Sequence, residues 1–224
     1  MTKEDKQLLL QELEKEGVKF LPWIGDKYDE GIYYDEKGEL QYGSDGSGKG
    51  KKVLVLGESF YWGEEDDEDE TSEENDNASS YFVSDLIEQI ISENHDFNVR
   101  TFSRFKNAMC YNKNKDVSII KFWEHLIFYD YVQEPLIYPR LSPTEKQFSD
   151  SETSFWKVID ICKPDVLIAW GMRLYNHLPP EGEPGSDFVE TWMYKDNIKV
   201  IPIIHPAAPI FSTEKIFNTL KATL

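Results

Sequence analysis

Four segments of the sequence place a small or polar residue at the end of a short apolar run. They are Gly57-Glu58-Ser59 after residues 52–56, Asp130 within 126–132, Gly171 after 165–170, and His205-Pro206-Ala207 after 199–204. A carboxylate such as Glu58 can activate water or stabilise a developing cation. The imidazole of His205 can donate to an anion that develops on a leaving group. These two residues are the candidate catalytic groups.

Each candidate also has a purely structural interpretation. Glu58 can be a surface acid next to a helix N-terminus, and His205 can be a histidine with satisfied hydrogen bonds in the fold. Gly57 precedes Glu58 where only a small residue lets backbone approach a ligand closely. Pro206 fixes its own φ and holds His205 extended, which gives the imidazole a reproducible direction.

Short apolar runs alternate with helical patterns along the chain and would position these residues. Strands are expected at 52–56, 126–132, 165–170 and 199–204, and helices at 3–16, 83–92, 117–125, around 155–162, at 172–178 and at 213–223. Such alternation predicts an α/β fold, three layers α/β/α with a central, mostly parallel four-stranded sheet. In sheets of this kind the ligand crevice lies outside the carboxyl ends of the strands, where all four segments end.

The length and composition favour one domain over residues 1–224, with an N-terminal helix and loops in 1–50 and an acidic loop in 64–79. The chain has 24 basic and 42 acidic residues, a net charge of −18, and ten of the acids lie in 64–76. Without that run, 24 bases face 32 acids, a net charge of −8. The overall charge disfavours binding to nucleic acid or an anionic membrane by bulk electrostatics.

Other features favour a protein without metal or cofactor. Two cysteines, Cys110 and Cys162, cannot form a four-thiolate zinc or iron–sulfur site. The run at 43–50 resembles a phosphate-binding loop only superficially, since it precedes a strand and lacks Ser or Thr after Lys49. The sequence has no signal-peptide core and no apolar run of membrane-spanning length, so a cytoplasmic protein is expected.

Aromatic residues gather around the segment that follows residues 52–56. Phe60, Tyr61, Trp62, Tyr81 and Phe82 form this group. Stacking on a flat ring is one interpretation, and ordinary core packing is the commoner one.

These segments, in order, resemble the motifs of the uracil-DNA glycosylase superfamily, especially its GEAPG-type, iron–sulfur-containing branch. The segments that carry the resemblance are Gly57-Glu58-Ser59, Tyr81-Phe82-Val83, Phe128–Gln133 with the proline-rich segment Pro139–Glu145, Lys163–Gly171, and Ile204-His205-Pro206-Ala207. The resemblance implies a DNA-repair hydrolase that flips a base into a pocket and cleaves its glycosidic bond. It implies that Phe82 stacks on the base, Glu58 orients water or stabilises the sugar cation, and His205 stabilises the departing base.

The sequence departs from that pattern in three ways. The cluster cysteines are missing, so no cofactor is expected. The base-reading Asn is replaced by Asp130, which when ionised only accepts hydrogen bonds and therefore disfavours uracil's O4 or prefers a ring with an exocyclic amine. Asn107 is a candidate substitute before the expected strand. The acidic run lies between Glu58 and Phe82, where it would repel a DNA backbone within a screening length of about 10 Å.

Two further functions are compatible with the same residues. The pocket could bind a free nucleobase or nucleoside, as a sensor or small-molecule hydrolase without DNA. The chain could instead be a non-catalytic interaction protein whose acidic loop docks a basic partner. The candidate binding residues for a base are Gly57, Ser59, Phe60, Phe82, Asn107, Asp130, Gly171, Pro206 and Ala207.

Overall fold

The computed structural model describes residues 1–43, 50–61, 79–92, 99–111, 117–137, 141–187 and 189–224. Its helices are α1 (Lys3–Lys15), α2 (Phe82–Ile91), α3 (Val99–Met109), α4 (Ile119–Trp123), α5 (Glu145–Cys162), α6 (Met172–His177) and α7 (Thr213–Lys221), with 3-10 turns η1 (Tyr28–Glu30) and η3 (Lys195–Asn197). Its strands are β1 (Trp23–Ile24), β2 (Ile32–Tyr34), β3 (Leu40–Tyr42), β4 (Val53–Gly57), β5 (Leu126–Asp130), β6 (Val166–Trp170), β7 (Glu183–Pro184), β8 (Trp192–Tyr194) and β9 (Ile198–Ile203). The acidic run and most of the 43–50 segment lie outside the described residues.

The main sheet has the order β1-β5-β4-β6-β9-β8-β7. Its centre is the predicted parallel set β5, β4, β6 and β9, so the mostly parallel α/β architecture is confirmed. The prediction of four strands is wrong, because β1 pairs antiparallel with β5 at one edge and β8 and β7 extend the sheet antiparallel beyond β9. These added strands are two or three residues long, too short to show an alternating apolar pattern.

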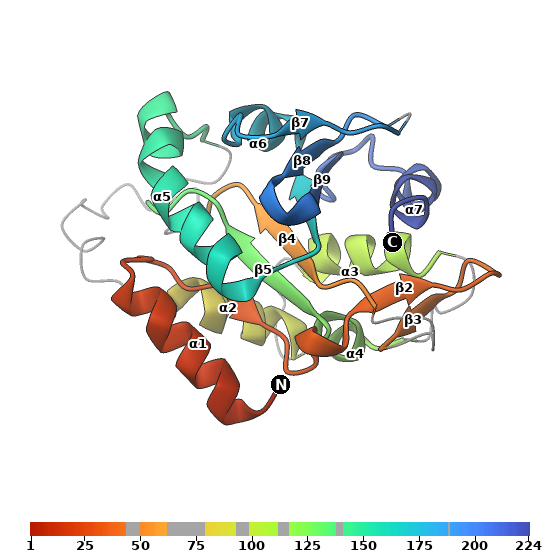
Figure 1. Cartoon of the computed structure of the whole chain (residues 1–224), viewed down its shortest axis with the longest axis horizontal. Coiled ribbons are helices and arrows are strands. Elements are labelled where there is room, and N and C mark those ends of the chain that lie inside the picture. Colours follow the sequence, from red (N-terminus) through yellow and green to blue (C-terminus); the bar gives the residue numbers. More distant parts are fainter. Residues whose placement is uncertain (44–49, 62–78, 93–98, 112–116, 138–140, 188) are drawn as a thin grey trace.

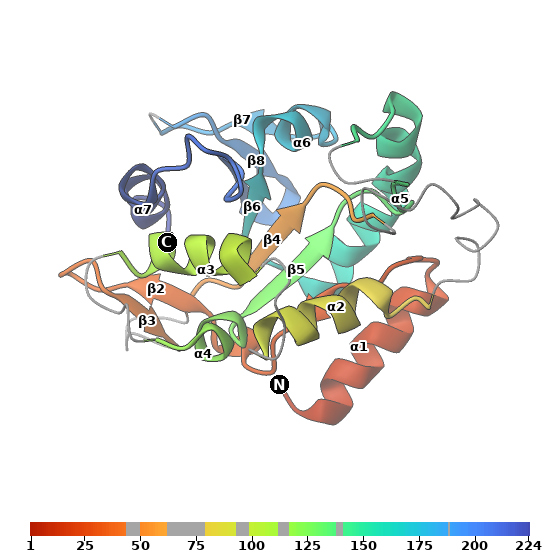
Figure 2. The ribbon, with the colours of Figure 1, turned by 180° about the vertical axis from the view of Figure 1, so that it is seen from behind.

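Helices cover both faces of the sheet. Figure 1 shows α1 and α5 on the near face, and Figure 2, from behind, shows α2, α3 and α4 over the other. Alternate strand residues feed two separate cores: Val55 and Phe128 pack with α2, α3 and α4, whereas Leu54 and Ile127 pack with α1 and α5. A strand buried on both faces must be apolar at every position, which explains the uninterrupted apolar runs of the central strands.

Helix boundaries follow local capping chemistry. Thr2 and Thr144 each form a capping box with the third residue of the helix, at the starts of α1 and α5. Ser118 caps α4, which therefore begins two residues after the expected start at 117. The predicted helix at 83–92 is α2, whereas α3 was not expected from the sequence. No described helix is long and apolar enough to cross a lipid bilayer.

Parallel pairing brings the strand ends into one row. Gly57 pairs with Asp130, and Trp170 pairs with Ile203. All four residues share the strand parity of the core that faces α2, α3 and α4, so Asp130 and Trp170 project on that side of the sheet. Beyond the last paired residues, the backbone N–H groups of Tyr131 and Val132 donate to the carbonyl oxygens of Gly57 and Glu58.

The absence of a side chain at residue 57 is a packing requirement. A Cβ atom there would lie 2.1 Å from Oδ1 of Asp130 and 2.7 Å from Cζ of Phe128. Gly57→Ala is therefore expected to lower the free energy of unfolding by about 2–3 kcal/mol, because two buried groups must shift. Urea unfolding measures the loss.

Gly17→Ala is the matched control. Gly17 has φ +89°, but a Cβ atom added there would meet no atom within 4 Å, so only the backbone cost applies. That cost is about 1 kcal/mol for a left-handed residue with a side chain. Equal losses for the two variants would contradict the packing argument at Gly57.

Candidate functional site

Three of the predicted residues share one electrostatic environment at the carboxyl ends of the parallel strands. Glu58 leaves β4, Asp130 ends β5, and His205 follows β9. Burial raises the pKa of Asp130 and lowers that of His205, and the negative charge of Glu58 adds to the first shift and opposes the second. The site is therefore assembled from residues far apart in the chain, since Asp130 follows Glu58 by 72 positions and His205 follows it by 147.

Asp130 is a buried carboxyl. The residue is 7% exposed, and in the part of the chain that the structure describes its side-chain oxygens form no hydrogen bond. Burial raises its pKa to about 7, and the charge of Glu58 adds to the effect. The side chain of Asp130 therefore takes up or releases a proton near neutral pH and has lone pairs available to a ligand.

Glu58 forms a bidentate ion pair with Arg173, the second residue of α6. The Nε atom of Arg173 donates to Oε2 of Glu58 over 2.8 Å, and Nη2 donates to Oε1. Nη1 donates to the hydroxyl of Ser142, in the segment before α5. The side chain of Glu58 is 15% exposed and that of Arg173 is 47% exposed, so solvent reaches the guanidinium more easily than the carboxylate.

His205 has a defined tautomer when neutral. The backbone N–H of Ala207 donates to Nδ1 over 3.1 Å, so the ring proton of the neutral imidazole is on Nε2. Burial lowers the pKa of His205, and Glu58 opposes this shift. The ring lies edge-to-face with Trp170, with 5.8 Å between centroids. His205 can thus donate one hydrogen bond through Nε2 without carrying a charge.

The loop that carries His205 is held by a residue that the sequence analysis did not identify. Arg104, on α3, donates to the carbonyl oxygens of Ala208 and Phe211, and its guanidinium lies 5.0 Å from the ring of Phe211. Arg173 was also missed, although it follows Gly171 by two positions at a strand end. Its position near Glu58 depends on a pairing across 115 residues.

The remaining predicted residues lie in two places: Gly171, Pro206, Ser59 and Ala207 follow the parallel strands, whereas Asn107 lies on α3. Gly171 has φ +108°, and a Cβ atom there would lie 3.9 Å from Cβ of His205, which places the β6 and β9 ends side by side. Pro206 is buried, Ser59 is half-buried and Ala207 is exposed. Asn107 lies at an exposed position near the C-terminal end of α3, a helix that packs on α7 and α4.

One member of the aromatic group, Phe60, is part of the core, and another, Trp62, lies outside the described residues. Phe60 is 5% exposed, with its ring centroid 4.5 Å from that of Phe20 and 5.9 Å from that of Phe82. Phe82 is the first residue of α2 and is half-buried, and Tyr61 is 40% exposed. Phe60 is therefore a packing residue, whereas Phe82 and Tyr61 keep part of their rings accessible.

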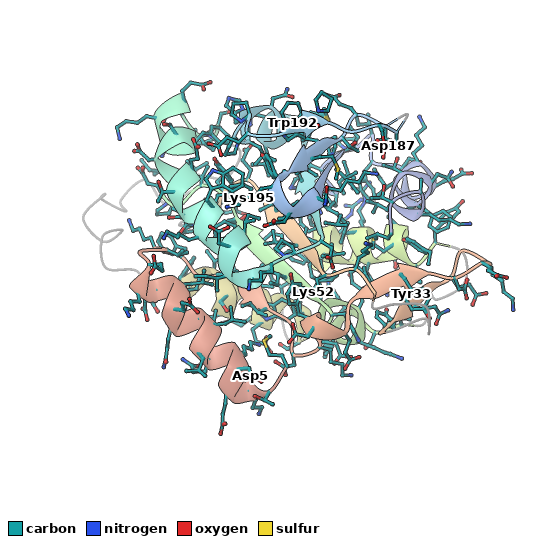
Figure 3. All side chains as sticks on the ribbon, viewed as in Figure 1. Asp5, Tyr33, Lys52, Asp187, Trp192 and Lys195 are labelled. Carbon is teal, nitrogen blue, oxygen red and sulfur yellow. The ribbon has the colours of Figure 1, made fainter. Side chains whose placement is uncertain are left out.

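Two hollows of the surface are not lined by Glu58, Asp130 or His205. One, of about 200 Å³, lies between α6 and β8 and is lined in part by Tyr175, Trp192 and Tyr194. The other, of about 620 Å³, lies beside the segment after β5. Figure 3 shows Trp192 at the end of the molecule occupied by α6 and β7.

The described residues contain no cluster of three or more His, Cys, Asp or Glu side chains that could hold a metal ion. Cys110 and Cys162 are buried free thiols on different sides of the sheet. Comparison of the sequence with protein-family models and with curated proteins finds no match. The chemistry of the site therefore has to be argued from its own residues.

Because the carboxyl of Asp130 is buried, the free energy of unfolding is expected to depend on pH. The folded chain keeps the proton of Asp130 up to about pH 7, whereas the unfolded chain releases it near the ordinary pKa of 3.8. Unfolding therefore releases a proton between these values, and this contribution to stability falls as the pH rises through the interval. Relative to Asp130→Asn, the wild type is expected to lose roughly 2–3 kcal/mol between about pH 5 and about pH 8.

Urea unfolding at both pH values measures this difference, and near-UV circular dichroism checks that the variant keeps its packing. A constant difference between wild type and variant across the interval would show that Asp130 does not titrate there.

Proposed function

We propose that this chain recognises a nucleobase at the carboxyl edge of the sheet and hydrolyses its N-glycosidic bond, as a uracil-DNA-glycosylase-like enzyme acting on DNA. The observation that carries the proposal is that Glu58, Asp130 and His205 come from the ends of three parallel strands at one edge of the sheet, where the charge of Glu58 acts on the pKa of the other two. The three groups supply what the reaction needs: a carboxylate, a group that reads the edge of a base, and a donor for the leaving group.

His205 would stabilise the departing base. Cleavage of an N-glycosidic bond leaves negative charge on the base, and a donor already oriented toward that charge lowers the barrier. The amide of Ala207 keeps the proton of neutral His205 on Nε2. A neutral donor is suited to this task, because it stabilises the anion without first having to bind a proton from solvent.

Asp130 would read the hydrogen-bonding edge of the base. An ionised carboxylate accepts from two adjacent N–H groups, as in a ring with an exocyclic amine next to a protonated ring nitrogen. A protonated carboxyl donates one hydrogen bond and accepts one, which also suits an edge with one carbonyl and one N–H. With a pKa of about 7, Asp130 samples both forms near neutral pH, so the pH would influence which base is bound.

Glu58 would act on the sugar side of the bond. Its carboxylate can hold a water molecule or stabilise positive charge that develops on the sugar. In the described arrangement both of its oxygens accept hydrogen bonds from Arg173, which compensates much of its charge.

Exposed apolar side chains surround this edge and support a duplex substrate. Ile210, in the loop after His205, is 76% exposed, the highest value among the exposed large apolar side chains of the described residues. Other exposed members near the strand ends are Tyr61, Ile137, Leu141 and Met172. Apolar side chains at such a rim can wedge into a base stack and help to extrude a nucleotide.

A second candidate, binding of a free nucleobase or nucleoside, is favoured by the shortage of cations. Within the described segments that directly follow β4, β5, β6 and β9, at 58–61, 131–137, 171–177 and 204–212, Arg173 is the one Lys or Arg. Phosphate contacts by Lys and Arg supply most of the affinity of DNA-binding proteins.

Excision of a base tests the first function. The wild type is expected to release a base from at least one member of a panel of oligonucleotides that carry deaminated or modified bases. Glu58→Gln and His205→Ala should each reduce the rate by about 100-fold or more, because each removes a group that acts in the transition state. Release by the wild type but not by these variants, measured by chromatography, supports the proposal.

If the wild type releases no base from any oligonucleotide, the DNA glycosylase function is wrong. A thermal-shift screen with free bases and nucleosides then decides whether the second function holds.

Asp130→Asn tests the reading of the base edge. The amide donates and accepts at once, so it should shift the ratio of uracil to guanine binding toward uracil by about tenfold or more at pH 8, because guanine carries its exocyclic amine next to a protonated ring nitrogen, the edge that suits a carboxylate. Calorimetry or thermal shift with the two free bases measures the ratio. An unchanged ratio would show that Asp130 does not contact the base.

Ile210→Ser tests the wedge. Loss of the apolar side chain should reduce excision from duplex DNA much more than from single strands, because single strands need no unstacking from a partner. Leu8→Ser is the matched control, since Leu8 is 63% exposed on α1, away from the carboxyl edge. Equal effects on the two substrates would exclude the wedge.

A further inference from the structure

Arg173 stands out because of its position and its partner. It is the one Lys or Arg in the described segments that follow the four parallel strands, and it lies in a chain of net charge −18. All three nitrogens of its guanidinium donate, two to Glu58 and one to Ser142. Nevertheless 47% of the side chain is exposed, so a ligand in solution can reach it.

A guanidinium binds carboxylate and phosphate with the same fork of N–H groups. The pair of donors that holds Glu58, Nε and Nη2, is a fork of this kind. A phosphate that takes both donors must displace the carboxylate. Binding of phosphate at this fork and pairing of Arg173 with Glu58 therefore exclude each other.

Displacement of Arg173 would change the site beyond the ion pair. The carboxylate of Glu58 lies close enough to Asp130 and His205 to act on the protonation of both. Arg173 compensates part of that charge while it is paired. Once the guanidinium moves to another anion, the full negative charge of Glu58 acts on the bound base and sugar.

We propose that Arg173 is a phosphate-binding residue that pairs with Glu58 when no ligand is bound. A phosphate group of the substrate then displaces Glu58 from the guanidinium, and the released carboxylate becomes available for the reaction. This inference rests on the proposed function only for the identity of the substrate, a nucleotide within a phosphodiester chain. The phosphate site itself can be tested without any base chemistry. The carboxylate of Glu58 would then be free to act only when a phosphate-bearing substrate is bound.

A purely structural ion pair makes the opposite prediction. In that case Arg173 joins the end of β4 to α6 and to the segment before α5, and phosphate does not compete. Removing either partner would then lower stability without changing the binding of phosphate. Only competition between Glu58 and phosphate for Arg173 predicts that loss of Glu58 strengthens phosphate binding.

The test is calorimetric titration with thymidine 3′,5′-bisphosphate, and with thymidine as the probe without phosphate. The wild type is expected to bind the bisphosphate more tightly at low salt than at high salt. Arg173→Gln should weaken this binding by about tenfold or more, because the charged fork is lost. Glu58→Gln should strengthen it by about threefold or more, because a neutral amide competes less well for the guanidinium.

Lys195→Gln is the matched control. Lys195 is 51% exposed and paired with Asp160, much as Arg173 is paired with Glu58. It lies in η3, just before β9 begins, at the amino edge of the sheet (Figure 3). Its removal should leave the binding of the bisphosphate within a factor of about two of the wild type, since only long-range charge changes.

Weaker or unchanged binding of the bisphosphate by Glu58→Gln would overturn the inference, and so would unchanged binding by Arg173→Gln. Failure of every form to bind the bisphosphate would overturn it as well. The proposed function is judged separately, by release of bases from oligonucleotides and binding of phosphate-free bases. If the wild type excises bases but Arg173→Gln and Glu58→Gln do not change the affinity for the bisphosphate in opposite directions, only the phosphate inference is refuted.

Discussion

The pairing of β4 with β5 sets Gly57 beside Asp130, and the carboxyl of Asp130 occupies the space that a side chain at residue 57 would need. A carboxyl in that position is removed from water on the side of the sheet covered by α2, α3 and α4. Its burial raises its pKa, because the ionised form has lost its hydration without gaining a hydrogen bond from the described part of the chain. The chemical character of the site thus depends on one contact between neighbouring parallel strands.

The second determinant of the site is the distribution of charge around that carboxyl. Two acids, Glu58 and Asp130, lie close enough to repel each other, and Arg173 pairs with the more exposed of them. His205 adds a donor whose pKa is lowered by burial, which favours the neutral imidazole. A cation that moved away from Glu58 would change all three groups together, because their charges are coupled at short range in a poorly solvated setting.

Strand ends, not strands, carry the candidate chemistry. β4, β5 and β6 are buried on both faces and carry no charged side chain before Asp130, the last residue of β5, so their polar groups lie where the strands end. Arg104 fixes the loop after β9 from α3, and Gly171, with φ +108°, joins β6 to α6. The scaffold therefore needs long-range contacts to orient the side chains that its strands bring to one edge.

The sequence by itself determined the central strands, most of the helices and the row of strand-end residues, because burial on both faces and helical periodicity leave strong local patterns. It did not reveal β1, β7 and β8, whose two or three residues have no pattern and exist only through pairing with longer strands. It also did not reveal α3, where Asn107 lies at an exposed position on the helix. Only the tertiary structure decided that Glu58 pairs with Arg173 and that Asp130 is buried without a hydrogen bond from any described residue, since both depend on contacts between residues far apart in the chain.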